Sequence, residues 1–152
     1  MKKTLRLCIC LLLLLSVYSP KVLAQTSQKQ IVSQELSTIQ QERTRFLYGF
    51  YTAYMSSLVY GVDGLDRILR EEYVSREVQK RKVDADVLLD AQDCIEENLK
   101  TLNVVAIDKD WYKVSFEWPS FYPKVPARQH AILVKIGGGK KNYKIVDVKV
   151  EH

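Results

Sequence analysis

The spacing of apolar residues changes once along the chain, near Leu99, and this change limits which folds the chain can adopt. From Ile31 to Val59 apolar residues recur every three or four positions, which is typical of a long amphipathic helix. From residue 111 to 118 they alternate, which is typical of a strand that buries one face. Helices followed by an antiparallel sheet predict an α+β fold, with the long helix lying across the concave side of a curved sheet.

Shorter helices are expected between the long helix and the sheet. Gly61 should end the long helix, because glycine tolerates the left-handed backbone of a helix C-terminus. Asp63 is the expected N-cap of a helix over 63–73, and Ser75 the N-cap of a short helix after it. Residues 84–94, with the sequence DADVLLDAQDC, are predicted to form one more short helix.

The sequence after Leu99 predicts about four antiparallel strands. They are the branched run TLNVVAID, the alternating run 111–118, HAILVKI and YKIVDVKV, the last two joined by a glycine-rich hairpin. Three of the four prolines lie between Trp118 and His130, which indicates a long connection or a bent edge strand.

The first 24 residues have the pattern of a secretory signal peptide. Lys2, Lys3 and Arg6 precede an apolar run from Leu7 to Val17, and cleavage is expected after Ala24. The run is shorter than the roughly 20 residues of a spanning helix, so no membrane anchor is expected after cleavage. We therefore expect a periplasmic or extracellular protein.

Removal of this segment leaves 128 of the 152 residues, enough for a single α+β domain over 25–152. The net charge falls from +5 to +1, because four basic and no acidic residues are lost. A charge this small argues against a nucleic-acid partner. Of three cysteines only Cys94 remains, so no intramolecular disulfide is possible; it is expected to be a small buried side chain rather than a nucleophile. A monomer or a homodimer is expected.

The aspartates of residues 84–94 raise the question of a metal site. A calcium loop starting at Asp84 would need a ligand, a glycine and a glutamate where Leu88, Leu89 and Ile95 stand, so no metal is expected. On a helix, Asp86, Asp90 and Asp93 would share one stripe, which Glu97 extends. That stripe faces solvent, or else Asp90, Gln92 and Asp93 line the rim of a pocket.

Aromatic residues supply further candidates for a ligand site. Most should be core, but hydroxyl and indole groups around a cavity would suit a small organic ligand. His130 begins a strand and could act as a general base with Asp90 or Asp93. No phosphate-binding glycine loop or zinc pattern is present, so no cofactor is expected. The candidate ligand-binding residues are Tyr51, Tyr54, Asp90, Gln92, Asp93, Trp111, Tyr112, Trp118 and His130.

Several segments resemble those of a known group of proteins. LLDAQD before LKTLNV, then DWYKVSF, HAILVKI and YKIVDV, are similar to a family of small exported bacterial proteins of unknown function. That family resembles the cystatin-like, nuclear transport factor 2-like cone superfamily. The resemblance runs from Arg45 to Val150 and implies a cone with a cavity between helix and sheet. Because that superfamily includes enzymes, ligand carriers and protein-binding modules, it implies no single activity.

Three functions follow from these features. The first is a binding module that takes a small ligand or a protein partner in or around the pocket. The second is a hydrolase or isomerase-type enzyme that uses His130 with Asp90 or Asp93; a His130 more than about 6 Å from every carboxylate would exclude it. The third is an inhibitor or immunity-type protein with an exposed aromatic patch around Trp111.

Overall fold

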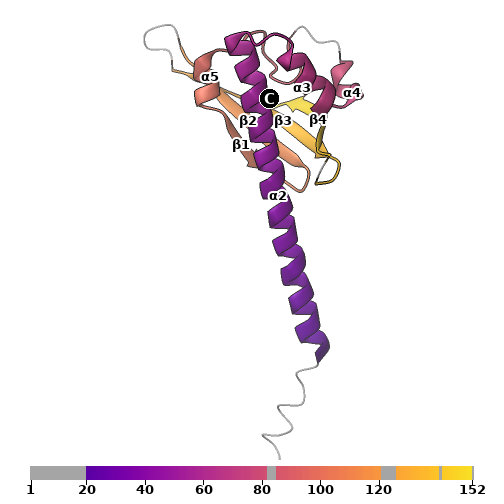
Figure 1. Ribbon diagram of the computed structural model, residues 1–152. Coiled ribbons are helices and arrows are strands. Elements are labelled where there is room, and N and C mark those ends of the chain that lie inside the picture. Colours follow the sequence, from indigo (N-terminus) through magenta and orange to yellow (C-terminus); the bar gives the residue numbers. More distant parts are fainter. Residues whose placement is uncertain (1–19, 82–84, 121–125, 141, 152) are drawn as a thin grey trace, which may run out of the picture. The chain divides into compact units, whose positions relative to one another are not determined.

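A computed structural model describes residues 20–81, 85–120, 126–140 and 142–151, with side chains from residue 34 onward (Figure 1). Most of the expected signal peptide lies outside these residues. The chain divides into two compact units, Met1–Thr38 and Ile39–His152. Among the described residues no helix is long and apolar enough to cross a membrane. The elements are α2 (Pro20–Tyr60), α3 (Leu65–Tyr73), α4 (Arg76–Gln79), α5 (Glu96–Lys100), β1 (Asn103–Ala106), β2 (Trp111–Trp118), β3 (Arg128–Gly137) and β4 (Lys144–Val150).

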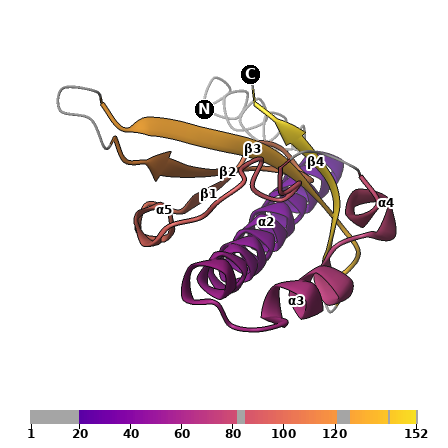
Figure 2. The same ribbon diagram turned by 90° about the horizontal axis from the view of Figure 1, so that it is seen from above.

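The four strands form one antiparallel sheet in the order β1-β2-β3-β4, which confirms the α+β prediction. Alternation decides which face each strand buries: Tyr112, Val114 and Phe116 of β2 pair with Val134, Ile132 and His130 of β3, so their side chains share one face. In Figure 2 the C-terminal part of α2 runs along that face.

The hydrophobic core lies between α2 and this inner face of the sheet. Five residues of the apolar face predicted for the long helix are at most 4% exposed, which confirms that face, whereas Ile39 and Leu58, predicted with them, are 42% and 39% exposed. Phe50 packs against Tyr51 and Tyr54, with ring centroids 5.3 and 5.7 Å apart. The core members from α2 are Leu47, Phe50, Tyr51, Tyr54 and Met55.

Two short helices follow α2 and reach the edge of the sheet. Val74 forms a parallel bridge with Ile145 of β4, and the Ser75 amide donates to the Ile145 carbonyl at 2.8 Å. The Ser75 hydroxyl accepts from the Val78 amide at 3.4 Å, so the predicted cap of α4 is confirmed. These contacts leave β4 covered on its outer edge.

The predicted Asp63 cap of α3 is wrong. The N-cap is Gly64, with φ +73° and no side-chain hydrogen bond. The chain turns between α2 and α3 through two left-handed glycines, Gly61 at φ +64° and Gly64, and this places the N-cap one residue after Asp63 and the helix start at Leu65.

The predicted helix over residues 84–94 is also wrong. The described part is a turn, closed by an antiparallel bridge between Asp86 and Ala91. The Asp86 carboxylate accepts from the Leu88 amide at 2.7 Å, a local bond that competes with helix formation. Asp90 has φ +49°, a left-handed conformation that aspartate tolerates better than most residues. Asp86, Asp90 and Asp93 therefore do not share a helical stripe; Asp84 lies outside the described residues.

The β3–β4 hairpin depends on Gly138. This residue has φ +84°, and a Cβ placed on it would lie 2.1 Å from the Asn142 carbonyl oxygen. We expect Gly138→Ala to lower the free energy of unfolding by about 2 to 3 kcal/mol, from left-handed strain and the backbone clash. Gly139→Ala is the control, because a Cβ there meets nothing within 4 Å. Urea unfolding followed by circular dichroism measures both; equal losses would contradict this account of the hairpin.

Candidate functional site

The candidate site is built on the turn from Asp86 to Ala91, and Asp86 fixes this turn to the helices. The Arg70 guanidinium of α3 donates to the Asp86 carboxylate at 2.6 Å and, through Nε, to the Tyr54 hydroxyl at 2.7 Å. The Tyr54 hydroxyl of α2 in turn donates to Asp86. The side chains of Asp86 and Arg70 are 17% and 31% exposed, so this ion pair is screened only in part by water.

The same turn is also held by its backbone and by the core. The Asp90 amide donates to the Asp86 carbonyl at 2.6 Å, and the Asp86 amide to the Ala91 carbonyl at 3.0 Å. Leu88 and Leu89 are 0% and 1% exposed and belong to the hydrophobic core. A turn fixed by charge on one side and by apolar burial on the other can present its remaining side chains in a defined arrangement.

An open pocket of 530 Å³ lies beside this turn. Its volume is within the roughly 300 to 1,000 Å³ that is usual for small-molecule sites. Its other wall is the end of the β2–β3 pair, where Trp118 pairs with Arg128 and Phe116 with His130. Because paired residues share a face, Trp118, Arg128 and His130 lie on the inner face. Figure 2 shows this end of β2 and β3 extending beyond α2. The pocket is lined by Asp90, Ala91, Gln92, Asp93, Trp118, Arg128 and His130.

His130 connects the strand wall to the turn. Its Nε2 lies 2.8 Å from the Leu89 carbonyl oxygen and 3.9 Å from Asp90 Oδ2. A carbonyl oxygen can only accept, so Nε2 carries a proton and Nδ1 is the acceptor of the neutral ring. The ring also packs against Phe116, with centroids 5.2 Å apart. The backbone of the turn, more than the Asp90 carboxylate, therefore orients the imidazole.

The pocket carries charge of both signs. Asp90 and Asp93 lie on the turn side and Arg128 on the strand side, where it forms no ion pair with a described residue. With His130 neutral, the formal charges of Asp90, Asp93 and Arg128 sum to −1. The indole of Trp118 adds a flat, partly exposed surface. Such an arrangement favours a ligand with an ammonium group and an aromatic portion, since indole faces and carboxylates both attract cations.

The structure brings together five of the nine predicted ligand-binding residues. Tyr51, Tyr54 and Tyr112 lie instead in the packed core, each at most 1% exposed. Trp111 faces the opposite side of the sheet, where the Nζ atoms of Lys149 and Lys135 lie 4.7 and 5.8 Å from its ring centroid. The five residues at the pocket are Asp90, Gln92, Asp93, Trp118 and His130.

Three residues of this site were missed in the sequence. Arg128 stands two positions before His130, so extending the alternation backward from Ile132 would have found it. Asp86 was noticed only as one member of an acidic run. Its partner Arg70 is 16 positions away on another helix, and no local pattern relates the two.

Cys94 lies just after the turn and is half-buried. Burial, and then the charge of Asp86, raise the pKa of the Cys94 thiol to about 11. The thiol is therefore protonated at neutral pH, which agrees with its interpretation as a non-nucleophilic side chain.

We expect Cys94 in a chain starting at Gln25 to react with Ellman's reagent at least about tenfold more slowly at pH 7.5 when folded than in urea. Equal rates would contradict this environment.

The acidic residues of this pocket do not form a metal site. Among the described residues no group of three or more His, Cys, Asp or Glu side chains could hold a metal ion.

Comparison with known proteins adds support for the fold. No protein-family model matches the chain. No curated protein matches it either. The crystal structure of a protein of unknown function from Bacteroides thetaiotaomicron VPI-5482 is similar, with a TM-score of 0.69 and 25% sequence identity. The alignment covers 79% of this chain and 98% of that chain. This similarity supports the fold and assigns no activity to the protein.

Proposed function

We propose that this protein is an exported binding module that takes a small organic ligand in the pocket between the Asp86–Ala91 turn and the β2–β3 end. One observation carries the proposal: a turn anchored by Asp86 holds Asp90 and Asp93 opposite Trp118, Arg128 and His130 around 530 Å³ of open space. Anchored polar groups around a concave surface are the usual features of a ligand site.

The ligand class follows from the lining. We infer an amine with an aromatic portion, because its ammonium group would meet Asp90 and Asp93 while its ring lies against Trp118. A carboxylate on the same ligand would have Arg128 as its partner. An aromatic amino acid satisfies all three groups at once.

An enzyme that uses His130 is the second candidate. The 3.9 Å from His130 Nε2 to Asp90 lies well within the 6 Å limit set for that hypothesis. The Leu89 carbonyl takes the orienting role that a carboxylate has in a catalytic triad, which leaves Nδ1 as the potential base. Against this candidate, the pocket lining contains no Ser, Thr, Cys or Lys side chain that His130 could activate, and the nearby Cys94, protonated and half-buried, does not line the pocket.

Three related probes test the binding proposal by NMR on ¹⁵N-labelled chain starting at Gln25. They are phenylalanine, 2-phenylethylamine, which lacks the carboxylate, and 3-phenylpropanoate, which lacks the ammonium group. We expect the two amines to shift the amide signals of Gln92, Asp93 and His130 saturably, and 3-phenylpropanoate to bind at least about tenfold more weakly. Shifts elsewhere, or equal binding of all three probes, would reject the proposed class.

Variants separate binding from catalysis. Asp93→Asn should weaken 2-phenylethylamine binding, while Glu97→Gln, an exposed acidic residue outside this pocket, should leave it unchanged. A time-dependent chemical change of any probe that His130→Gln abolishes would support the enzyme instead.

The proposal also includes export of the protein and the family to which it belongs. We infer a signal peptide cleaved after Ala24, membership of the exported bacterial family, and the cone superfamily fold. The charged start and the apolar run of residues 1–24 support the signal peptide. The short motifs between Arg45 and Val150 support the family and its fold. Intact mass spectrometry of protein from a secreting bacterial host should give a chain beginning at Gln25. A chain that retains Met1 in the cytoplasm would contradict export.

A further inference from the structure

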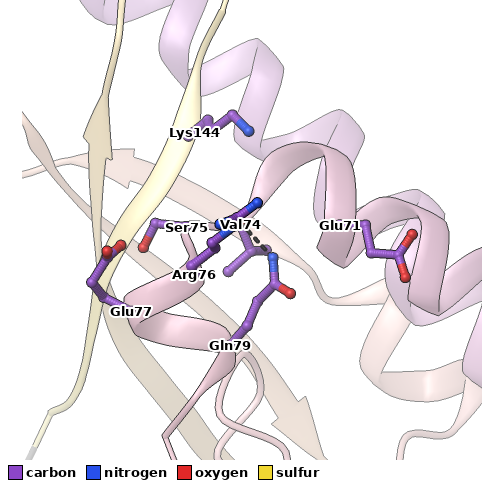
Figure 3. Close-up of a pocket in the computed structure, with 7 residues that line it drawn as sticks. All are labelled: Glu71, Val74, Ser75, Arg76, Glu77, Gln79 and Lys144. Carbon is purple, nitrogen blue, oxygen red and sulfur yellow. Dashed lines mark hydrogen bonds between the residues drawn. The ribbon is translucent and has the colours of Figure 1, made fainter.

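A second pocket, of 470 Å³, lies between α3, α4 and the start of β4 (Figure 3). Its floor is Val74, 2% exposed, which the parallel bridge to Ile145 fixes to the sheet. The remaining lining is polar, with charges of both signs. It consists of Glu71, Ser75, Arg76, Glu77, Gln79 and Lys144.

Two cations of this pocket have no ionic partner. Neither Arg76 nor Lys144 forms an ion pair with a residue that the structure describes, whereas Arg43, Arg70 and Arg81 each pair with an aspartate. Both cations line the pocket, Arg76 from the start of α4 and Lys144 from the start of β4 (Figure 3). Two unpaired cations directed at one concave surface would attract an anionic group.

The acidic residues do not neutralise this pair. Glu77 points to the opposite side in Figure 3. The pKa of Glu77 is lowered first by a hydrogen bond from its own amide and then by one from the Ser75 hydroxyl, with Lys80 and Arg76 as lesser causes. Glu71 lines the pocket from α3, and in Figure 3 its carboxylate is turned away from the cations. Glu71 and the two cations thus lie at separate ends of the pocket, and Glu77 lies on the far side of the cations.

Gln79 supplies an oriented acceptor between these ends. Its Nε2 donates to the carbonyls of Arg70 and Val74 at 2.8 and 2.7 Å. Both amide protons are therefore used, and the Oε1 atom remains as an acceptor. A donor on a ligand could bind Oε1.

We propose that this pocket is a second binding site, for a short zwitterionic peptide. Its carboxylate lies between Arg76 and Lys144, and its ammonium group lies toward Glu71 and Gln79 Oε1. A volume of 470 Å³ suits two or three small residues, and the pocket has no aromatic side chain to favour a flat ligand. This site shares no residue with the Asp90–His130 pocket.

Triglycine and two derivatives test the proposal by NMR, with the amide signals of Ser75 and Gln79 as the readout. Triglycinamide lacks the carboxylate, and N-acetyl-triglycine lacks the ammonium group. Triglycine should bind, and each derivative should bind at least about fivefold more weakly. Equal binding of triglycine and N-acetyl-triglycine would show a simple anion site and overturn the zwitterion, and no shift with triglycine at 20 mM would overturn the site.

Charge-removing variants complete the test. Arg76→Gln with Lys144→Gln should reduce triglycine binding at least about tenfold. Lys80→Gln is the matched control, because Lys80 is exposed at the end of α4 but does not line the pocket. Circular dichroism confirms that each variant is folded. If Lys80→Gln weakens triglycine binding as much as the double variant does, the effect is one of overall charge and the site is overturned.

Discussion

Asp86→Ala should lower the free energy of unfolding by about 3 kcal/mol, the typical cost of removing one partner from a largely buried ion pair. The substitution leaves the Arg70 guanidinium, the Tyr54 hydroxyl and the Leu88 amide without their shared acceptor. Urea unfolding followed by circular dichroism measures the loss.

Asp93→Ala is the control for this substitution. Asp93 lies seven positions further on, is exposed, and forms no ion pair with a described residue. Its removal should change stability by less than about 0.5 kcal/mol. If the two variants lose similar stability, Asp86 does not anchor the turn.

Leu88→Ala tests the apolar side of the same anchor and should cost about 3 kcal/mol. Leu88 is 0% exposed, and truncating a buried leucine removes apolar contact and leaves a cavity. Leu58→Ala is the matched control, because Leu58 of α2 is 39% exposed. The control should lose less than about 1 kcal/mol. A loss that is the same at both positions would contradict the burial of the turn.

The strands and the long helix could be predicted because each buries one face at a regular period. Tyr112, Val114 and Phe116 alternate with polar or exposed neighbours, and the α2 stripe recurs at three and four. Ser75 was found as a cap for a similar reason, since its hydrogen bond is local.

The turn at Asp86–Ala91 could not be predicted in the same way. The four aspartates and the apolar pairs of residues 84–94 fit a helix as well as a turn, and the deciding contacts of Asp86 come from Arg70 and Tyr54, 16 and 32 positions away. Asp63 was misplaced because the left-handed Gly64 shifted the start of α3. Asp90, Gln92 and Asp93 were nevertheless predicted in one pocket with Trp118 and His130, since the run was expected at the junction of helices and sheet; only the short α5 separates it from β1.

The fluorescence of Trp118 tests the central claim most directly. The chain has two tryptophans, so Trp111→Phe leaves Trp118, in the pocket wall, as the single reporter. Titration with 2-phenylethylamine should change its emission saturably, and Asp86→Ala, which releases the turn, should weaken that binding at least about tenfold. Emission that does not respond to 2-phenylethylamine up to 20 mM would contradict a ligand site in this pocket.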